Sequence, residues 1–172
     1  MAAAFCTLSN IPREVLSSFL AAAPRQRKGQ PVSVSISILV ADDSDSIRRA
    51  LRFYFNSHAD FCVCGEAADG IEAIENTRRL KPDVVVLDFV MPRLNGLETA
   101  RAIRSISPDL PVIMFTSHMS NALEEQARVA GIRSVLSKTD GLELLLKEIR
   151  KLAARDGAGN GNGKVRETSG GA

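Results

Sequence analysis

Five polar side chains that could take part in chemistry come directly after short apolar segments of this chain. Two carboxylates end the segment 35–40, and a third follows the continuous apolar run 84–87. A hydroxyl follows the segment 110–115, and an ammonium lies near the end of a short apolar segment at 134–136. The five residues are Asp42, Asp43, Asp88, Thr116 and Lys138.

Three carboxylates brought close together would repel one another unless a cation neutralised them or one of them held a proton. Oxygen ligands without nearby histidine or cysteine favour a hard cation, and Mg²⁺ fits best. With a hydroxyl and an ammonium beside it, such a site could bind a phosphoryl group. Asp88 is the best candidate for a nucleophile that forms an acyl-phosphate, because a central strand would carry it.

Each of these residues also has a plain structural interpretation. Asp88 could cap a helix or a turn, the pair Asp42-Asp43 could cap the helix that starts near Asp45, and Lys138 could be a solvated loop lysine. What favours a site is the combination, because acids at the ends of two predicted strands, a hydroxyl and an amine all fall at strand ends. The sequence therefore predicts that they converge.

The elements that must position these residues alternate between strand and helix patterns. Strand-like segments alternate with apolar residues at helical spacing, which is typical of βαβ units with a parallel sheet. We predict an α/β fold, a flavodoxin-like doubly wound five-stranded parallel sheet of order 2-1-3-4-5 in a three-layer sandwich. The predicted strands are 35–40, 61–66, 84–87, 110–115 and 134–136, and the predicted helices lie around 47–55, 71–80, 97–106, 121–130 and 142–152.

The chain divides into three zones by its composition. Residues 1–33 form an N-terminal extension, predicted as a short helix followed by a linker around Pro24 to Pro31. Residues 34–152 form the folded domain. Residues 153–172 are rich in glycine and polar residues, and we predict a flexible tail there because little apolar surface is available to offset the entropy of ordering.

Composition excludes several classes of protein. The 172 residues are 45% hydrophobic and 24% charged, which is ordinary for a globular domain. A net charge of +2 gives no reason to expect direct contact with nucleic acid or with an anionic membrane. Three cysteines do not suggest a disulfide framework, and no apolar stretch is long enough to span a bilayer. We therefore expect a cytoplasmic protein.

The motifs around these residues resemble the receiver domain of two-component response regulators. The resemblance covers about residues 35–152 and rests on specific motifs. They are Ile38-Leu39-Val40-Ala41-Asp42-Asp43, then the stretch from Pro82-Asp83 through Asp88 to Met91-Pro92 with Asn95-Gly96, then Pro111 to Thr116, and finally Lys138.

This resemblance implies a role for each site residue. Asp88 would accept a phosphoryl group from a phosphohistidine on a sensor histidine kinase or a histidine phosphotransfer protein. Asp43 would bind Mg²⁺ directly and Asp42 largely through water, with Asp88 and the backbone carbonyl of Val90 completing the protein's ligands. The remaining two residues, Thr116 and Lys138, would supply the hydroxyl and the ammonium that contact the phosphoryl group.

The predicted function is thus a Mg²⁺-dependent phosphorylation switch that signals through protein–protein contacts with an output protein, with a homodimer on phosphorylation as one form of output. It would catalyse only its own phosphorylation and dephosphorylation.

An alternative is the receiver part of a DNA-binding transcription regulator whose output domain is absent from this chain. A haloacid-dehalogenase-like phosphatase is disfavoured, because Val90 stands where that family has a second aspartate. Val135 occupies the position of a switching aromatic residue in many receivers, which leaves the output relay open.

Overall fold

The computed structural model describes residues 35–157, and the predicted N-terminal helix and linker lie outside the described residues. Five strands alternate with five helices along this part of the chain. The strands are β1 (Ile36–Ala41), β2 (Phe61–Ala67), β3 (Val84–Leu87), β4 (Val112–Thr116) and β5 (Ser134–Ser137). The helices are α2 (Asp45–Asn56), α3 (Gly70–Leu80), α4 (Gly96–Ile106), α5 (Asn121–Ala130) and α6 (Leu142–Gly157).

The five strands form one parallel sheet in the order β2-β1-β3-β4-β5, which confirms the predicted fold. β3 lies at the centre of the sheet, and all four of its residues are buried, as its unbroken apolar sequence Val84–Leu87 predicts. The chain reverses its direction of strand addition between β1 and β3. The carboxyl ends of these two strands therefore flank the switch point where open α/β sheets bind ligands.

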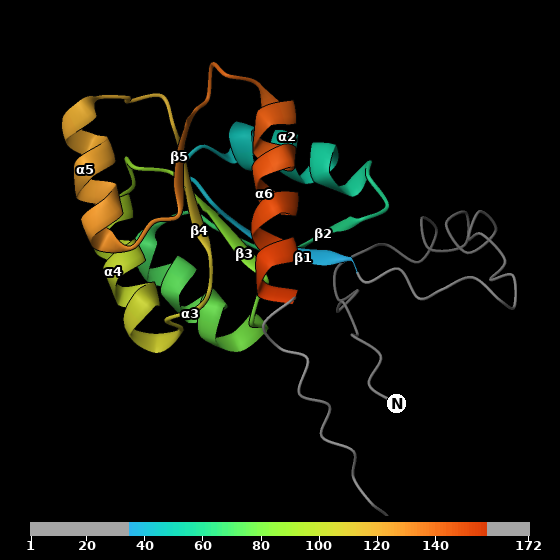
Figure 1. Cartoon of the computed structure of the whole chain (residues 1–172), viewed down its shortest axis with the longest axis horizontal. Helices are drawn as coiled ribbons and strands as arrows, with labels where there is room; N and C mark the ends of the chain where they lie inside the picture. Colours follow the sequence, from blue (N-terminus) through green and yellow to red (C-terminus); the bar gives the residue numbers. More distant parts are fainter. Residues whose placement is uncertain (1–34, 158–172) are drawn as a thin grey trace, which may run out of the picture. The chain divides into compact units, whose positions relative to one another are not determined.

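Helices cover both faces of the sheet (Figure 1). One core packs α2 and α6 against the sheet through residues that include Leu51, Phe55, Leu145 and Ile149. The other core packs α3, α4 and α5 against the opposite face, through residues such as Ile103. This arrangement is the predicted three-layer sandwich. No helix within residues 35–157 combines the length and the apolar character needed to cross a bilayer.

Several element boundaries follow directly from local sequence signals. The Asp69 side chain accepts hydrogen bonds from two backbone N–H groups at the start of α3, and Gly131 ends α5 with a φ of +87°. Several strand boundaries differ from prediction by one or two residues, and the end of α6 differs by more. β4 begins at Val112 and not at Leu110, and α6 continues to Gly157, beyond the predicted domain end at Leu152. The residues that extend α6 include the strong helix formers Ala153 and Ala154.

Candidate functional site

Three of the predicted site residues lie together at the carboxyl edge of the sheet. Asp42 and Asp43 follow β1, and Asp88 follows the neighbouring strand β3, where its N–H donates to the carbonyl of Ala41 at 2.8 Å. Carboxylate oxygens of the three residues all lie within 4.8 Å of one another. Asp42 and Asp88 are buried, with 2% and 6% of their surface exposed, whereas Asp43 is exposed.

The ammonium of Lys138 lies between the two buried carboxylates. Its Nζ donates a hydrogen bond to Asp42 Oδ2 at 2.6 Å. The same Nζ forms an ion pair with Asp88 Oδ1 at 3.2 Å, and no hydrogen bond reaches this oxygen from the described residues. Asp88 Oδ1 is therefore a buried oxygen next to a positive charge that still lacks a hydrogen-bond donor. Such an atom is costly to leave unsatisfied, so it is ready to bind a cation or a donor.

Burial raises the pKa of the Asp42 carboxyl above its ordinary value, because desolvation disfavours the charged form. The hydrogen bond and charge of Lys138 and the backbone N–H of Ser44 oppose this shift, while the negative charge of Asp88 adds to it. The aspartates therefore form a strained acidic cluster, in which one lysine partly neutralises two buried carboxylates.

The donor set of this cluster fits Mg²⁺. All of its acidic ligands are carboxylate oxygens, and Mg²⁺ prefers oxygen ligands at about 2.0–2.1 Å in octahedral geometry, in which opposite ligands are about 4 Å apart. Carboxylate oxygens of the three residues lie within 4.8 Å of one another, so small shifts of the side chains would let them share one cation. The unsatisfied oxygen of Asp88 supplies a second reason, because a divalent cation would compensate it.

The hydroxyl residue Thr116 ends β4 and is fully buried. Its Oγ1 accepts a hydrogen bond from the N–H of His118 at 3.2 Å, and its backbone carbonyl accepts one from the N–H of Lys138 at 2.9 Å. The strand ends that carry the hydroxyl and the ammonium are thus joined directly. Val90 lies in the loop between β3 and α4 with 46% of its surface exposed. Val135 is partly buried and packs against the core beneath α3, α4 and α5.

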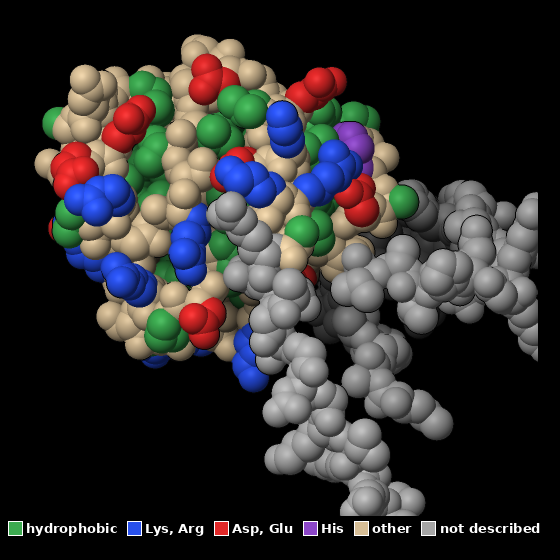
Figure 2. Space-filling model, viewed as in Figure 1, with side chains coloured by type: hydrophobic (Ala, Val, Ile, Leu, Met, Phe, Trp, Pro, Cys, Tyr) green, Lys and Arg blue, Asp and Glu red, His purple; other side chains and the backbone are tan. Residues whose placement is uncertain are grey.

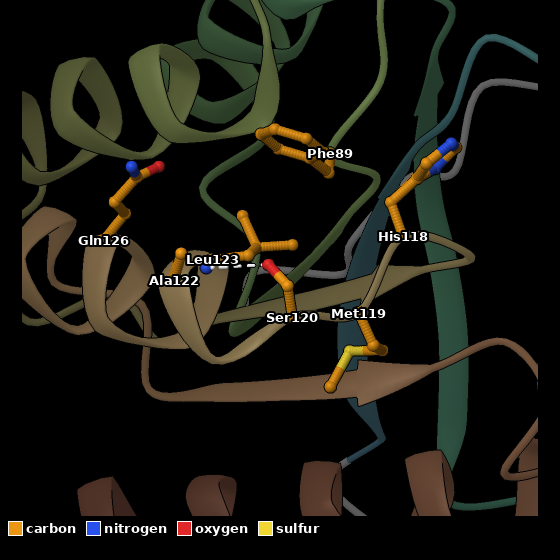
Figure 3. A pocket seen from close by; sticks show the side chains of 7 residues that line it. All are labelled: Phe89, His118, Met119, Ser120, Ala122, Leu123 and Gln126. Atoms are coloured by element: carbon orange, nitrogen blue, oxygen red, sulfur yellow. Dashed lines mark hydrogen bonds between the residues drawn. The ribbon is translucent and has the colours of Figure 1, made fainter.

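A pocket of about 450 Å³ opens between Phe89, in the loop after β3, and the beginning of α5. Figure 3 shows Phe89 and Leu123 facing each other across it, while the His118 ring lies at the far side of the loop that leads to α5. Ser120 begins α5 by accepting a hydrogen bond from the N–H of Leu123 at 3.1 Å. The pocket has Phe89 in its wall, the residue immediately after Asp88.

Sequence reasoning missed three residues that hold the loops of the site in place. Arg48 donates hydrogen bonds to the backbone carbonyls of both Asp42 and Asp43, and no pattern of residue types along the chain predicts such a contact. Arg93, in the loop after Asp88, pairs with Asp69 at the start of α3. Glu98 completes a capping box with Asn95, for which the spacing Asn95-x-x-Glu98 was an available signal.

Gly96 fixes the path of the loop that follows Asp88. Its N–H donates to the Phe89 carbonyl at 2.9 Å, and an added Cβ would lie 2.4 Å from the Asp88 carbonyl oxygen and 2.9 Å from Phe89 Cα. The residue begins α4, where alanine would otherwise be favoured over glycine by about 1 kcal/mol. Any loss of stability in Gly96→Ala therefore reports the close approach of the backbone.

We expect Gly96→Ala to lower the free energy of unfolding by about 1–3 kcal/mol in urea denaturation, as overpacked sites do. Gly65→Ala is the matched control. Its Cβ would also come within 2.4 Å of an atom, but that atom is Cδ1 of the flexible Leu80 side chain, which can move. Equal losses in the two variants would contradict a requirement for glycine at position 96.

Comparisons with known proteins point to one family. Residues 38–150 match the family model described as the response regulator receiver domain. The response regulator domain of CheB from Thermotoga maritima is 34% identical with a TM-score of 0.66, and the match covers 70% of this chain and 97% of that one. The signal receiver domain of the putative response regulator NarL from Mycobacterium tuberculosis is 29% identical with a TM-score of 0.66, covering 70% and 97% of the two chains.

Curated relatives match over a shorter stretch. A protein-glutamate methylesterase/protein-glutamine glutaminase of Pyrococcus horikoshii is 54% identical over 61 residues, which is 36% of this chain and 17% of the relative. An uncharacterized transcriptional regulatory protein, YhcZ of Bacillus subtilis, is 43% identical over 61 residues, 36% of this chain and 28% of its own. The aligned stretch thus covers much less than two thirds of these relatives. From the family match and the fold, the chain belongs to the response regulator receiver domains of two-component systems.

Proposed function

We propose that this chain is a phosphorylation switch in which Asp88 accepts a phosphoryl group from a phosphohistidine on a sensor histidine kinase or a histidine phosphotransfer protein. One observation carries the proposal. Lys138 holds two buried carboxylates together, and the oxygen of Asp88 that it approaches lacks a hydrogen-bond donor. A carboxylate that lies close to a cation and has an oxygen without a hydrogen-bond donor is suited to act as a nucleophile.

In the transfer, a carboxylate oxygen of Asp88 attacks phosphorus, and the bond from phosphorus to the histidine nitrogen of the donor breaks. The electron pair of that bond leaves with the imidazole, which takes up a proton from solvent. The Lys138 ammonium neutralises charge on the phosphoryl oxygens, and the Thr116 hydroxyl turns from its contact with the His118 N–H to donate to one of them.

The metal site would be built from Asp43 as a direct ligand, Asp42 largely through water, Asp88 and the backbone carbonyl of Val90. Bound Mg²⁺ would supply charge neutralisation for the phosphoryl oxygens. The buried Asp42, the exposed Asp43 and the unsatisfied oxygen of Asp88 support this assignment. The chain itself would catalyse only its own phosphorylation and dephosphorylation.

The output would be a change in protein–protein contacts, with an output protein or with a second copy of the chain. The face shown in Figure 2 carries Lys and Arg side chains interspersed with Asp and Glu, and mixed charge of this kind favours protein partners over nucleic acid. Phosphorylation would shift an equilibrium between two conformations of the domain. Val135 is partly buried and packs against the core at a position where many receivers have an aromatic residue. Because valine has no ring that could rotate, a different side chain would report the change.

The test is to incubate the full chain with acetyl phosphate and Mg²⁺ and to follow the intact mass. We expect a gain of one phosphoryl group, because acetyl phosphate supplies the same transferable group as phosphohistidine. The gain should disappear when EDTA removes the metal, since the crowded carboxylates would then repel the anionic donor. An unchanged mass with Mg²⁺ present would contradict the proposed function and indicate a receiver fold without phosphorylation.

A further inference from the structure

Arg48 connects the loop that carries Asp42 and Asp43 to the first turns of α2. Only 14% of its side chain is exposed. Its Nη1 donates to the backbone carbonyl of Asp42 at 2.7 Å and lies 3.2 Å from that of Asp43, a second hydrogen bond. A single guanidinium nitrogen thus bonds to the main chain of both acidic residues, while it touches neither of their carboxylates.

The rest of the guanidinium is fixed by acidic side chains on two other segments. Its Nε lies 3.5 Å from Glu66 Oε2 on the edge strand β2, and its Nη2 lies 3.3 Å from Asp45 Oδ1 on α2. Since the planar guanidinium holds its donors in a rigid fork, these contacts determine where the two carbonyls lie. The loop after β1 is therefore tied to both the sheet and the helix.

Such a tie matters because the loop must hold like charges close together. The carboxylates of Asp42, Asp43 and Asp88 crowd one edge of the sheet, and Asp42 and Asp88 repel each other in a buried environment. A loop that was free to relax would move its carboxylates apart. Metal affinity would then fall, because part of the binding free energy would be needed to bring them back together.

We propose that Arg48 is a positioning residue for the Mg²⁺ site, holding the backbone of Asp42 and Asp43 so that their carboxylates converge with Asp88. The inference rests on the proposed function, since it assumes that this cluster binds Mg²⁺. Through its hydrogen bonds to the two carbonyls, Arg48 would raise the affinity of the site for Mg²⁺, whereas its positive charge by itself would lower that affinity.

The sign of the effect separates positioning from simple electrostatics. A guanidinium near a divalent cation repels it, so loss of the positive charge by itself would tighten Mg²⁺ binding. Loss of the two hydrogen bonds to the carbonyls would weaken it. Arg52 offers a matched control in the same helix, because it pairs with Glu66 at 2.7 Å and, among the contacts of residues 35–157, reaches neither carbonyl.

The experiment measures Mg²⁺ binding to the full chain by isothermal titration calorimetry, with thermal melting to check that each variant folds. We expect Arg48→Gln to raise the Kd for Mg²⁺ roughly tenfold, as loss of a contact that orients metal ligands does. Arg52→Gln should bind Mg²⁺ as tightly as the unchanged chain, or slightly more tightly. Arg48→Lys keeps the charge and one donor group, so it should give an intermediate Kd, and it serves as the test variant if Arg48→Gln does not fold.

Phosphorylation by acetyl phosphate gives an independent readout. Arg48→Gln should need more Mg²⁺ for half-maximal rate but reach the rate of the unchanged chain at saturating Mg²⁺, because Arg48 does not touch the carboxylate of Asp88. An unaltered Kd in both Arg48 variants, or equal losses in Arg48→Gln and Arg52→Gln, would overturn the positioning role. An unchanged chain that binds no Mg²⁺ would overturn the proposed metal site itself, and the role of Arg48 with it.

Discussion

Replacing Asp88 by asparagine is expected to abolish the gain of a phosphoryl group from acetyl phosphate and to stabilise the metal-free fold at the same time. The amide has nearly the same shape as the carboxylate but is a far weaker nucleophile, so the acyl-phosphate cannot form. Stability should rise because Asp42 and Asp88 are both buried and repel each other, while Lys138 keeps its 2.6 Å hydrogen bond to Asp42. We expect a gain of about 1 kcal/mol, a size common when a functional site is relieved of strain.

Intact mass after incubation with acetyl phosphate and Mg²⁺ measures the first effect, and urea denaturation in EDTA measures the second. Asp109→Asn is the control for loss of one carboxylate, because Asp109 is exposed and should change neither quantity. A mass gain in Asp88→Asn would place the acceptor at another residue. A loss of stability would show that the ion pair of Asp88 with Lys138 outweighs the repulsion from Asp42.

The sheet was predictable because its signals are local and repeated. The unbroken apolar run Val84–Leu87 can be covered on both faces only in a central strand, and the structure places it there. Gly131 ends α5 at the predicted residue because glycine adopts the left-handed conformation without strain. The convergence of Asp42 with Asp88 followed from topology alone, since the carboxyl ends of neighbouring parallel strands share one edge.

The contacts that hold the site in shape could not be predicted in the same way. Arg48 binds backbone carbonyls, and every residue offers a carbonyl, so its partners depend on the packing of α2 against β1 and β2. Arg93 reaches Asp69 from a backbone with a φ of +67°, a conformation that its residue type does not suggest. The extension of α6 to Gly157 was not predicted, because the glycine-rich composition of residues 153–172 favours a flexible tail although Ala153 and Ala154 favour a helix.

Lys138→Met should have the largest effect on stability among substitutions at the site. The ammonium is the positive charge in contact with two buried carboxylates, whose side chains are 3% and 7% exposed. Methionine occupies a similar volume without charge, so Asp42 and Asp88 would stay buried without compensation. Breaking a buried pair in this way costs roughly 3–5 kcal/mol. Urea denaturation in EDTA at pH 7 measures the loss. Lys151→Met is the control, since the exposed pair of Lys151 with Glu148 contributes less than about 1 kcal/mol.

The pH dependence of this loss identifies its cause. Burial already raises the folded-state pKa of Asp42 above 3.8, and Lys138→Met removes the hydrogen bond and charge that oppose the shift. A carboxyl whose pKa is higher in the folded than in the unfolded state holds its proton more tightly when the chain is folded. The stability that this carboxyl contributes is therefore present at low pH and is lost as the pH rises through the folded-state pKa. The deficit of Lys138→Met should therefore be larger at pH 7 than at about pH 5. A second change, Asp88→Asn, should restore part of the stability at pH 7, and a deficit independent of both pH and Asp88 would mean that lost packing, not uncompensated charge, destabilises the variant.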